Sequence, residues 1–536
     1  MKYNVNDQPY NSNRYCLTAT NGMVCSTSSL ASSAGLEMLK KGGNAVDAAI
    51  ATAAVLSVTE PTSNGIGGDA FAIVWMNQKM VGLNASGYTP KNINIKEIKD
   101  KGYHSMPEKG WIPVTIPGQP KAWAALIERF GKLSLKEVLQ PAISYAENGY
   151  AISPTLAHLW DKYVSKNIDE YRKSSEFDEW IKTFTKNGEP YRFGEIVKLP
   201  NHGKTLRLIG ESNSKAFYEG EIAKQIVKQC KRDGGYIEED DLKDYDVEWV
   251  EPVSVNYHGY DIWEIPPNGQ GLTALMTLNI LKNFKFDKKD CTDTYHKQFE
   301  AMKMAFADAF DIITDPKNMK RDFHEYLSDD YGKIRAKEIS ENAELRNPVN
   351  PPKSGTVYLC TADKDGNMVS YIQSNYMEFG SGIVVEDYGI ALQNRGSDFS
   401  LEENHINALA PRKKTYHTII PGFITKDNKA VCSFGVMGGY MQPQGHVQVV
   451  TNLIDFNLNP QMALDAPRWQ WKEGNEFIVE PEFDKKIIEE LIAKGHRVTV
   501  ADNRYSFGRG QIILLADNGV YIGGTESRAD SNIACY

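Results

Sequence analysis

The sequence changes character abruptly at residue 355, and this change restricts the fold more than any other feature of the chain. Residues 347–355 read NPVNPPKSG and have neither a helical nor a strand period, so we expect an exposed loop of about nine residues. Directly after it, TVYLCTA (356–362) alternates like a strand, DKDGN forms a turn, and MVSYIQS (368–374) alternates again. The pattern predicts a β-hairpin that begins where an exposed loop ends.

The register of this hairpin pairs two hydroxyl residues. With the turn centred on Asp365, Thr356 and Ser374 lie nine residues to either side and therefore face each other on one side of the sheet. Strand propensity alone explains a threonine at this position. The chemical alternative is cleavage of the bond between Gly355 and Thr356, because the freed α-amino group titrates near neutral pH and can act as the base for the threonine's own hydroxyl. The hairpin pattern leaves both explanations open.

The composition indicates a folded protein with small partners. The 536 residues are 41% hydrophobic and 24% charged, which is typical of globular chains and excludes a collagen-like or wholly disordered one. The net charge is −9, so there is no overall positive field to hold nucleic acid or an anionic membrane. We expect small-molecule or peptide partners, and neither a nucleic-acid nor a membrane partner.

Cysteine usage and the N-terminal segment predict a cytoplasmic location. The seven cysteines are scattered and never spaced as C-x-x-C, which argues against a disulfide framework and a structural zinc site. The first residues are polar and lack the apolar core of a secretory signal. The most apolar long stretch, residues 45–58, is too short to span a bilayer and is interpreted as a buried helix.

The first third of the chain predicts helices and strands around one core. A helix should end at Lys41-Gly42-Gly43, and the next should begin at Asn44, with Asp47 completing an N-cap pair, and end at Pro61. GIGGDAFAIVWM (65–76) then predicts a glycine turn followed by a strand; without a Walker lysine it is a structural turn rather than a nucleotide site. Residues 169–198 are aromatic and charged, and the pattern does not distinguish a lid from an insertion.

Much of the chain resembles one family. TVYLCTADKDGNMVSYIQSNYMEFGSGIVVEDYGIALQNRGSDFS (356–400) is similar to the start of the small subunit of γ-glutamyltransferases, which are self-cleaving N-terminal-nucleophile hydrolases. KGGNAVDAAIATAAVLSVTEPTSNGIGGDAF (41–71), EIPPNGQG, GVMGGYMQPQGHVQVVTNLIDFNLNPQMALDAPR (435–468) and GGTESRAD (523–530) resemble the family in the same order. The resemblance implies an α/β (α+β) fold, the four-layered αββα sandwich. It also implies a large segment, 1–355, and a small segment, 356–536, that stay associated after cleavage as one intertwined unit.

The resemblance also implies the catalytic residues. Thr356 matches the nucleophile, whose Oγ attacks the Gly355 carbonyl during processing before water opens the ester. Ser374 matches the hydroxyl residue that positions the nucleophile, in agreement with the hairpin register. Gly438 and Gly439 match the glycine pair whose backbone N–H groups form the oxyanion hole.

Substrate recognition departs from the family pattern. Asp398 matches the acid that holds the α-amino group of the γ-glutamyl substrate, but the arginine expected to bind its α-carboxylate is replaced by Ser86. The paired serines become His417-Thr418, an expected asparagine becomes Tyr376, and the threonine after the nucleophile becomes Val357. Arg395 and Lys414 are candidate replacement cations, with a solvated surface charge as the alternative for each. His417 is either a ligand of the acyl group or a structural histidine.

The sequence therefore predicts a self-processing amidohydrolase that cleaves γ-glutamyl amides such as glutathione through a threonyl acyl-enzyme, with water or an amino acid resolving it. One alternative is a glutaryl- or cephalosporin-type acylase of the same superfamily, and another is an unprocessed relative that only binds a ligand. No His, Asp or Glu cluster has metal spacing, so neither a metal nor a cofactor is implied. A further homo-oligomer is left open.

Overall fold

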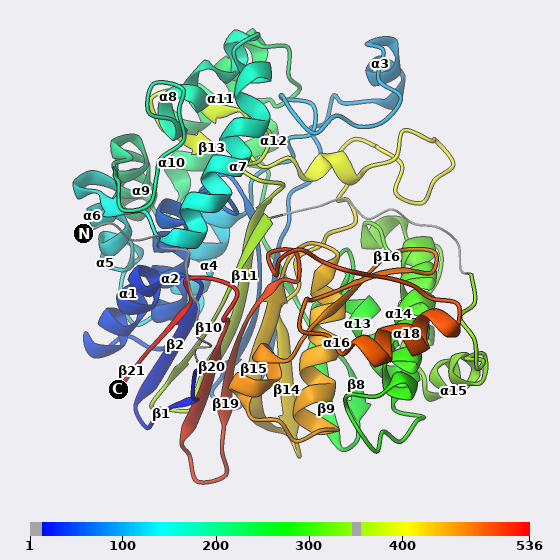
Figure 1. Ribbon diagram of the computed structural model, residues 1–536. Helices are drawn as coiled ribbons and strands as arrows, with labels where there is room; N and C mark the ends of the chain where they lie inside the picture. Colours follow the sequence, from blue (N-terminus) through cyan, green and yellow to red (C-terminus); the bar gives the residue numbers. More distant parts are fainter. Residues whose placement is uncertain (1–12, 346–354) are drawn as a thin grey trace, which may run out of the picture.

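Two large antiparallel sheets lie face to face in the computed structural model, which describes residues 13–345 and 355–536 (Figure 1). Helices cover the outer face of each sheet, so the layers follow in the order helix, sheet, sheet, helix. This arrangement confirms the αββα sandwich expected from the sequence. The expected loop at 347–355 lies, except for Gly355, outside the described residues.

The first sheet is built from strands that lie far apart in the chain. Its order is β21 (Asn532–Cys535), β2 (Gly22–Ser26), β10 (Gly355–Asp363), β11 (Met368–Tyr376), β3 (Asp69–Met76), β4 (Lys79–Ala85) and β7 (Glu248–Val250). All neighbours pair antiparallel. Strands β10 and β11 are buried along their whole length because both faces are covered.

The second sheet has the order β1 (Leu17–Ala19), β20 (Tyr521–Thr525), β19 (Arg509–Leu515), β15 (Lys429–Met437), β14 (Gly422–Lys426), β9 (Tyr260–Glu264) and β8 (Val253–Tyr257). A smaller sheet of β16 (Trp469–Glu473), β17 (Glu476–Val479) and β18 (Arg497–Val500) lies to one side of it. The short pairs are β5 (Tyr150–Ala151) with β6 (Ile196–Val197) and β12 (Val384–Val385) with β13 (Ile390–Ala391).

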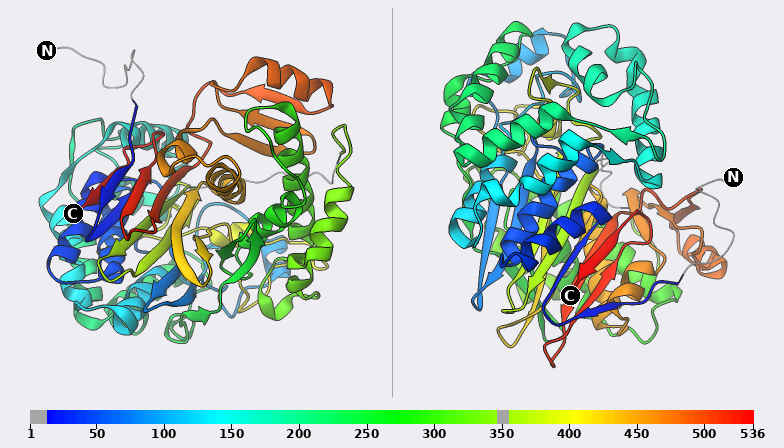
Figure 2. Two further views of the ribbon diagram at one scale, coloured as in Figure 1. Left: turned by 90° about the horizontal axis from the view of Figure 1, so that it is seen from below. Right: turned by 90° about the vertical axis from the view of Figure 1, so that its left-hand side faces the viewer.

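Each sheet has its own helical layer. Helices α1 (Ser29–Lys40), α2 (Ala45–Thr59), α4 (Gln119–Phe130) and α6 (Gln140–Asn148) cover the first sheet, and Figure 2 shows the blue α1 and α2 on its outer face. Helices α13 (Gly271–Leu281), α14 (Thr292–Ile312) and α16 (Met441–Ile454) cover the second. The remaining α-helices are α3 (Ile95–Asp100), α5 (Leu135–Val138), α7 (Pro154–Tyr171), α8 (Asp178–Phe184), α9 (Pro200–Ser212), α10 (Lys215–Tyr218), α11 (Glu221–Arg232), α12 (Glu239–Lys243), α15 (Asp329–Lys337), α17 (Pro460–Asp465) and α18 (Lys485–Ala493).

Helix α2 forms as its cap residues predicted. The Asn44 side chain accepts the N–H groups of Val46 and Asp47, and the Asp47 carboxylate accepts the N–H of Asn44 at 2.7 Å. Every residue of this alanine-rich helix is buried, because small side chains allow it to pack closely between the sheet and neighbouring helices. Among the described residues, no helix combines the length and the apolar character needed to cross a membrane.

The predicted hairpin is confirmed, with one irregularity at its start. Val357 pairs with Gln373, and the pairing continues without a shift to Ala362 opposite Met368. A bulge lies between the pairs Gly355–Tyr376 and Val357–Gln373: Ser374 and Asn375 of β11 lie opposite Thr356 of β10, so β11 carries the extra residue. The bulge therefore places an irregular backbone at the position of the candidate nucleophile.

Helices α7 and α8 pack onto the body of the protein, and α8 lies within the aromatic segment 169–198. Trp160, Trp180 and Phe184 from α7 and α8 surround Phe379, with ring centroids 4.8 to 5.6 Å from it. Phe379 follows β11, so this aromatic cluster joins α7 and α8 to the strand that carries Ser374. The close packing of these rings shows how the first part of the aromatic segment is held.

Candidate active site

Three oxygen atoms meet where the hairpin opens. The Thr356 Oγ1 lies 3.1 Å from the Ser374 Oγ and 2.7 Å from the carbonyl oxygen of Gly355. The Ser374 hydroxyl donates to the same carbonyl at 2.7 Å and accepts the N–H of Tyr376 at 2.8 Å. Thr356 and Ser374 are both fully buried. The bulge thus holds a hydroxyl beside the preceding peptide bond, while a second hydroxyl polarises that carbonyl.

The end of β15 lies near this cluster because of how the two sheets cross. Ser370, the partner of Cys360, donates to the Phe434 carbonyl at 3.3 Å, while Gly435 packs on the Tyr358 ring. Later residues of β15 therefore lie over earlier residues of β10. Gly438 and Gly439, which follow β15, come to the Thr356 end of the sandwich.

The Gly438-Gly439 turn has a conformation that suits glycine. Its φ angles are +142° and +61°, and a Cβ on Gly438 would lie 3.2 Å from the Gly508 Cα. Within the described ranges, neither of the two N–H groups has a hydrogen-bond acceptor. Unpaired backbone N–H groups at such a turn are suited to stabilising an oxyanion.

A buried arginine and a buried carboxylate lie beside Tyr376. The guanidinium of Arg395, in the one-turn helix Arg395–Asp398, covers the Tyr376 ring at 3.9 Å and donates from Nη1 to the Thr418 Oγ1 at 2.8 Å. Its Nη1 is 3.7 Å from the Asp398 Oδ2, and the Tyr376 hydroxyl donates to the other Asp398 oxygen. The Nε and Nη2 of Arg395 and the Oδ2 of Asp398 have no hydrogen-bond partner among the described residues. These atoms remain available to a charged ligand.

Burial and the charge of Arg395 have opposite effects on the pKa of Asp398. The removal of water raises the pKa of its carboxyl group to about 6, although the positive charge of Arg395 acts in the other direction. The Asp398 side chain is 5% exposed. A substrate ammonium at Oδ2 would favour the ionised form.

Asp69 is a second buried acid of the site, and the sequence analysis did not single it out. It pairs with Ser374 in the β11–β3 ladder, and its Oδ2 lies 3.0 Å from the Nε2 of His417. Burial lowers the pKa of His417, and its Nδ1 accepts the N–H of Ile419 at 3.4 Å, so the neutral ring donates from Nε2 to Asp69. Burial also raises the pKa of Asp69 to about 7, against the effect of Arg395.

The family model of γ-glutamyltranspeptidase matches residues 31–536 of the chain. The chain belongs to the γ-glutamyltranspeptidase family. Its members are N-terminal-nucleophile hydrolases, and this membership agrees with the sandwich and with the hairpin that carries Thr356.

Relatives of this γ-glutamyltranspeptidase-family chain are named for different activities. The glutathione hydrolase-like YwrD proenzyme of Bacillus subtilis is 39% identical over 522 residues, which cover 95% of this chain and 98% of the relative. The oxamate amidohydrolase proenzyme of Klebsiella pneumoniae is 30% identical, with 97% and 99% covered. A crystal structure of cephalosporin acylase from Bacillus halodurans is 52% identical, with a TM-score of 0.97 and 100% and 99% of the chains covered.

The fold brings most of the family-derived site residues together. Thr356, Ser374 and Tyr376 share one hairpin, and the contacts above join Tyr376 to Arg395, Asp398 and Thr418. Ser86 is buried and donates to the Asn84 side chain at 2.7 Å, so it supplies no charge in place of the family arginine.

Two candidates for substrate binding are placed differently from the expectation. Both ring nitrogens of His417 already have partners within the protein, so the structural alternative describes this histidine better than the ligand alternative. The Lys414 Nζ pairs with Glu248 at 2.8 Å, so Lys414 is engaged outside the Arg395 cluster. Arg395 is buried, and the expected alternative of a solvated surface charge is wrong for it.

The fold also brings together three side chains of the kinds that bind metal ions, a cluster that the sequence pattern did not reveal. Ligand atoms of His296, Glu300 and His496 lie within 4.8 Å of one another. The His296 Nδ1 and the His496 Nε2 are 2.8 Å apart, and the buried Lys303 ammonium is 2.5 Å from the Glu300 carboxylate. A histidine hydrogen bond and an ion pair account for this cluster, and Lys303 would repel a cation there.

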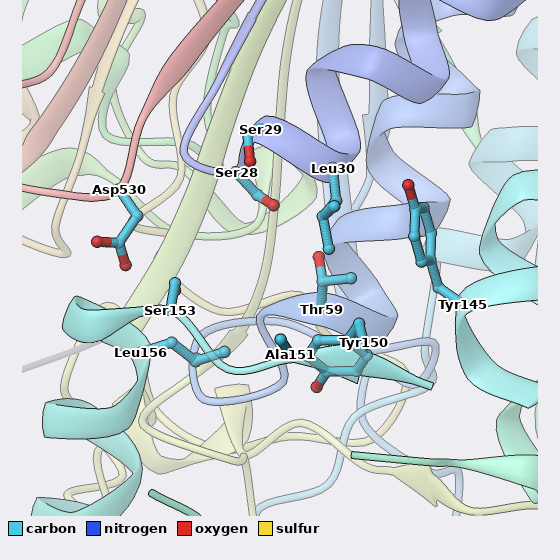
Figure 3. A pocket seen from close by; sticks show the side chains of 10 residues that line it. All are labelled: Ser28, Ser29, Leu30, Thr59, Tyr145, Tyr150, Ala151, Ser153, Leu156 and Asp530. Carbon is cyan, nitrogen blue, oxygen red and sulfur yellow. The ribbon is translucent and has the colours of Figure 1, made fainter. Parts of the chain in front are cut away.

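A separate cavity of about 350 Å³ lies between the start of α1, the end of α2 and the start of α7 (Figure 3). Its lining includes Ser28, Thr59, Ser153 and Asp530, and it includes none of the predicted site residues. The Asp530 carboxylate accepts the N–H and the hydroxyl of Thr155. This cavity is therefore distinct from the hydroxyl cluster at Thr356.

Proposed function

We propose that the chain is a self-processing amidohydrolase with Thr356 as its N-terminal nucleophile, acting on amides of carboxylate-bearing acyl groups, with γ-glutamyl amides such as glutathione as the first class. The observation that carries the proposal is the contact of the Thr356 hydroxyl with both Ser374 and the Gly355 carbonyl. The names of the relatives, which include several proenzymes, support it.

Processing begins at the bulge. The Thr356 Oγ attacks the Gly355 carbonyl carbon, the C–N bond breaks, and the hydroxyl proton passes to the departing nitrogen. The nitrogen becomes the new N-terminal amine, while an ester joins the two segments. Ser374 donates to the carbonyl oxygen, which carries the developing negative charge. Water then hydrolyses the ester and leaves segments 1–355 and 356–536.

The segments remain together because the first sheet interleaves them. Strand β10 of the small segment lies between β2 of the large segment and β11, and β11 pairs with β3 of the large segment. Breaking one peptide bond at the start of β10 leaves these ladders intact.

Turnover repeats the same chemistry on a substrate. The α-amine of Thr356 takes the hydroxyl proton, Oγ attacks the substrate carbonyl, and the N–H groups of Gly438 and Gly439 stabilise the oxyanion. The leaving amine takes the proton as the acyl-enzyme forms. Water or an acceptor amino acid then releases the acyl group.

The charged cluster fits the head group of a γ-glutamyl substrate. The free Nε and Nη2 of Arg395 match a carboxylate, and the free Oδ2 of Asp398 matches an ammonium. Arg395 thus replaces the cation that is missing at Ser86.

A dicarboxylic monoamide of the glutaryl type is the second candidate. Tyr376 already occupies one oxygen of Asp398, and burial raises the pKa of that carboxyl group, so an amine is less strongly required than a carboxylate. The relative named cephalosporin acylase, 52% identical, favours this candidate.

Mass analysis and two anilide substrates test the proposal. Wild-type protein should give fragments of about 40 and 20 kDa, apportioned by length from 60.0 kDa, with the smaller beginning Thr-Val-Tyr. Thr356→Ala should stay whole. Higher kcat/KM on γ-glutamyl anilide supports the first class, and higher kcat/KM on glutaryl anilide supports the second. A wild-type chain that stays whole and inactive contradicts the proposal and supports a ligand-binding protein.

A further inference from the structure

Asp69 is fully buried beside the reacting hydroxyls, yet none of the steps above uses it. It faces Ser374 across the β11–β3 ladder, on the side of the sheet that carries Thr356. Hydrogen bonds reach both carboxylate oxygens, so its orientation is fixed. A fully buried acid that carries four hydrogen bonds and feels the charge of Arg395 needs a physical explanation.

The first oxygen of Asp69 holds the chain that leads into Arg395. Its Oδ1 accepts from the Gln393 Nε2 at 2.8 Å and from the N–H groups of Gly87 and Gly118 at 3.2 and 3.3 Å. Gln393 lies two residues before Arg395, and its own N–H donates to the Gly67 carbonyl at 3.0 Å. This oxygen therefore fixes one flank of the arginine.

The second oxygen of Asp69 holds His417, which directly precedes Thr418, the residue that accepts a hydrogen bond from Arg395. Its Oδ2 accepts from the His417 Nε2 at 3.0 Å. The His417 backbone is held as well, because its N–H donates to the Asn268 carbonyl and its own carbonyl accepts from Gln270, each at 2.9 Å. Thr418, the next residue, accepts from Arg395 at 2.8 Å.

The negative charge of Asp69 also acts on the guanidinium of Arg395. Burial raises the pKa of Asp69, and the positive charge of Arg395 is the largest effect in the opposite direction. Arg395 has the same effect on the pKa of Asp398, so its charge acts on both acids. Nε and Nη2 of Arg395 form no bidentate pair with either acid and have no hydrogen-bond partner among the described residues, so they can pair with the carboxylate of a ligand.

We propose that Asp69 is a positioning residue that holds Arg395, through Gln393 on one side and His417-Thr418 on the other, as the binding group for the carboxylate of the acyl moiety. The inference deepens the proposed function and rests on its acyl site. It assigns Asp69 to substrate recognition and gives it no role in bond cleavage.

Kinetics of Asp69→Asn test the role. With an anilide whose acyl group carries a carboxylate, KM should rise about tenfold, the size of one charge-assisted contact, while kcat stays within about threefold. With butyryl anilide, which lacks the carboxylate, neither constant should change. Asp241→Asn removes a buried carboxylate of α12 that lies outside the site, and it should leave both substrates unaffected.

A double-variant cycle distinguishes positioning from a general structural effect. Arg395→Met alone should raise KM at least as much as Asp69→Asn, and the double variant should resemble Arg395→Met because Asp69 acts through the arginine. Additive effects, or an equal loss of kcat on both anilides, would overturn the inference. Gln393→Leu breaks one of the supporting contacts and should give a smaller, equally selective rise in KM, so the role remains measurable if Asp69→Asn does not fold.

Binding without turnover separates this inference from the proposed function. Calorimetric titration of the purified protein with glutarate and with L-glutamate should show binding that weakens about tenfold in Asp69→Asn. Binding that depends on both Asp69 and Arg395 supports the inference even if no anilide is cleaved. Absence of binding to wild-type protein, or binding that Asp69→Asn leaves unchanged, contradicts it.

Discussion

Thr356 and Ser374 lie on opposite strands of one bulge, and we assign them different chemical roles because of their positions. Both are buried hydroxyl residues, but only Thr356 follows the peptide bond whose carbonyl receives both hydroxyls. The regular part of the hairpin brings the two strands into register. At the bulge, where two residues of β11 lie opposite Thr356, the Thr356 hydroxyl is 2.7 Å from the Gly355 carbonyl oxygen.

At the residue scale, Ser374→Ala should slow processing about a hundredfold, comparable to the loss of one oxyanion donor. The reason is that Ser374 donates to the Gly355 carbonyl and contacts the attacking oxygen. Time courses of fragment appearance on denaturing gels measure the rate. Ser370→Ala is the matched control, because Ser370 is a buried serine of the same strand that bonds to Tyr358. Equal rates for Ser374→Ala and wild type would contradict the assignment.

At the element scale, the turn after β15 should tolerate no side chain at its first glycine. Gly438→Ala should lower turnover about a hundredfold or more, because a Cβ at φ +142° lies 3.2 Å from the Gly508 Cα and would displace the candidate oxyanion donors. The measurement is kcat on the better anilide. Gly366→Ala is the control: Gly366 has φ +82° with open space around it, so it reports backbone strain alone. A similar loss of turnover in both variants would rule out a special role for Gly438.

Glu526, which directly follows β20, should make the stability of the protein sensitive to acid. The positive charges of Arg468 and Arg528 outweigh burial and lower the pKa of its carboxyl group from 4.5 to about 2. The resulting stabilisation, about 3 kcal/mol, is fully present above pH ~4.5 and is lost as the pH falls toward 2. Glu526→Gln should reduce the free energy of unfolding at pH 7 by a similar amount and should flatten its pH dependence between 4.5 and 2.

Denaturant unfolding as a function of pH checks this effect. Glu403→Gln, which removes an exposed acid, should leave both the stability at pH 7 and the acid slope unchanged. An acid slope in Glu526→Gln equal to that of wild type would show that other groups carry the effect.

At the scale of the whole molecule, the processed segments should not separate under native conditions. The ladders of β10 with β2 and of β11 with β3 cross from one segment to the other and lie in the buried core. Native mass spectrometry of processed protein should therefore show one species that contains both fragments, and the fragments should separate only in denaturant. Free fragments in native buffer would contradict the interleaved sheet as the cause of association.

The sequence predicts local features of this fold better than distant ones. The capping of α2 by Asn44 and the pairing of the hairpin follow from residues close together in the chain, and both are confirmed. The site at Asp69 depends on His417, 348 positions away, and on Gln393, so no local period reveals it. The burial of Arg395 is equally invisible, because an isolated arginine in a loop is normally exposed.

The bulge at Gly355 is buried among the central strands, so folding and cleavage must occur in a fixed order. The sandwich must assemble before the cut, because only the assembled hairpin brings the hydroxyl to the carbonyl. Once cut, the two pieces are no longer joined by the covalent tether under which they folded together. Unfolding of the mature protein then becomes a one-way event, so its persistence depends on the height of the barrier to opening rather than on an equilibrium with the unfolded chain.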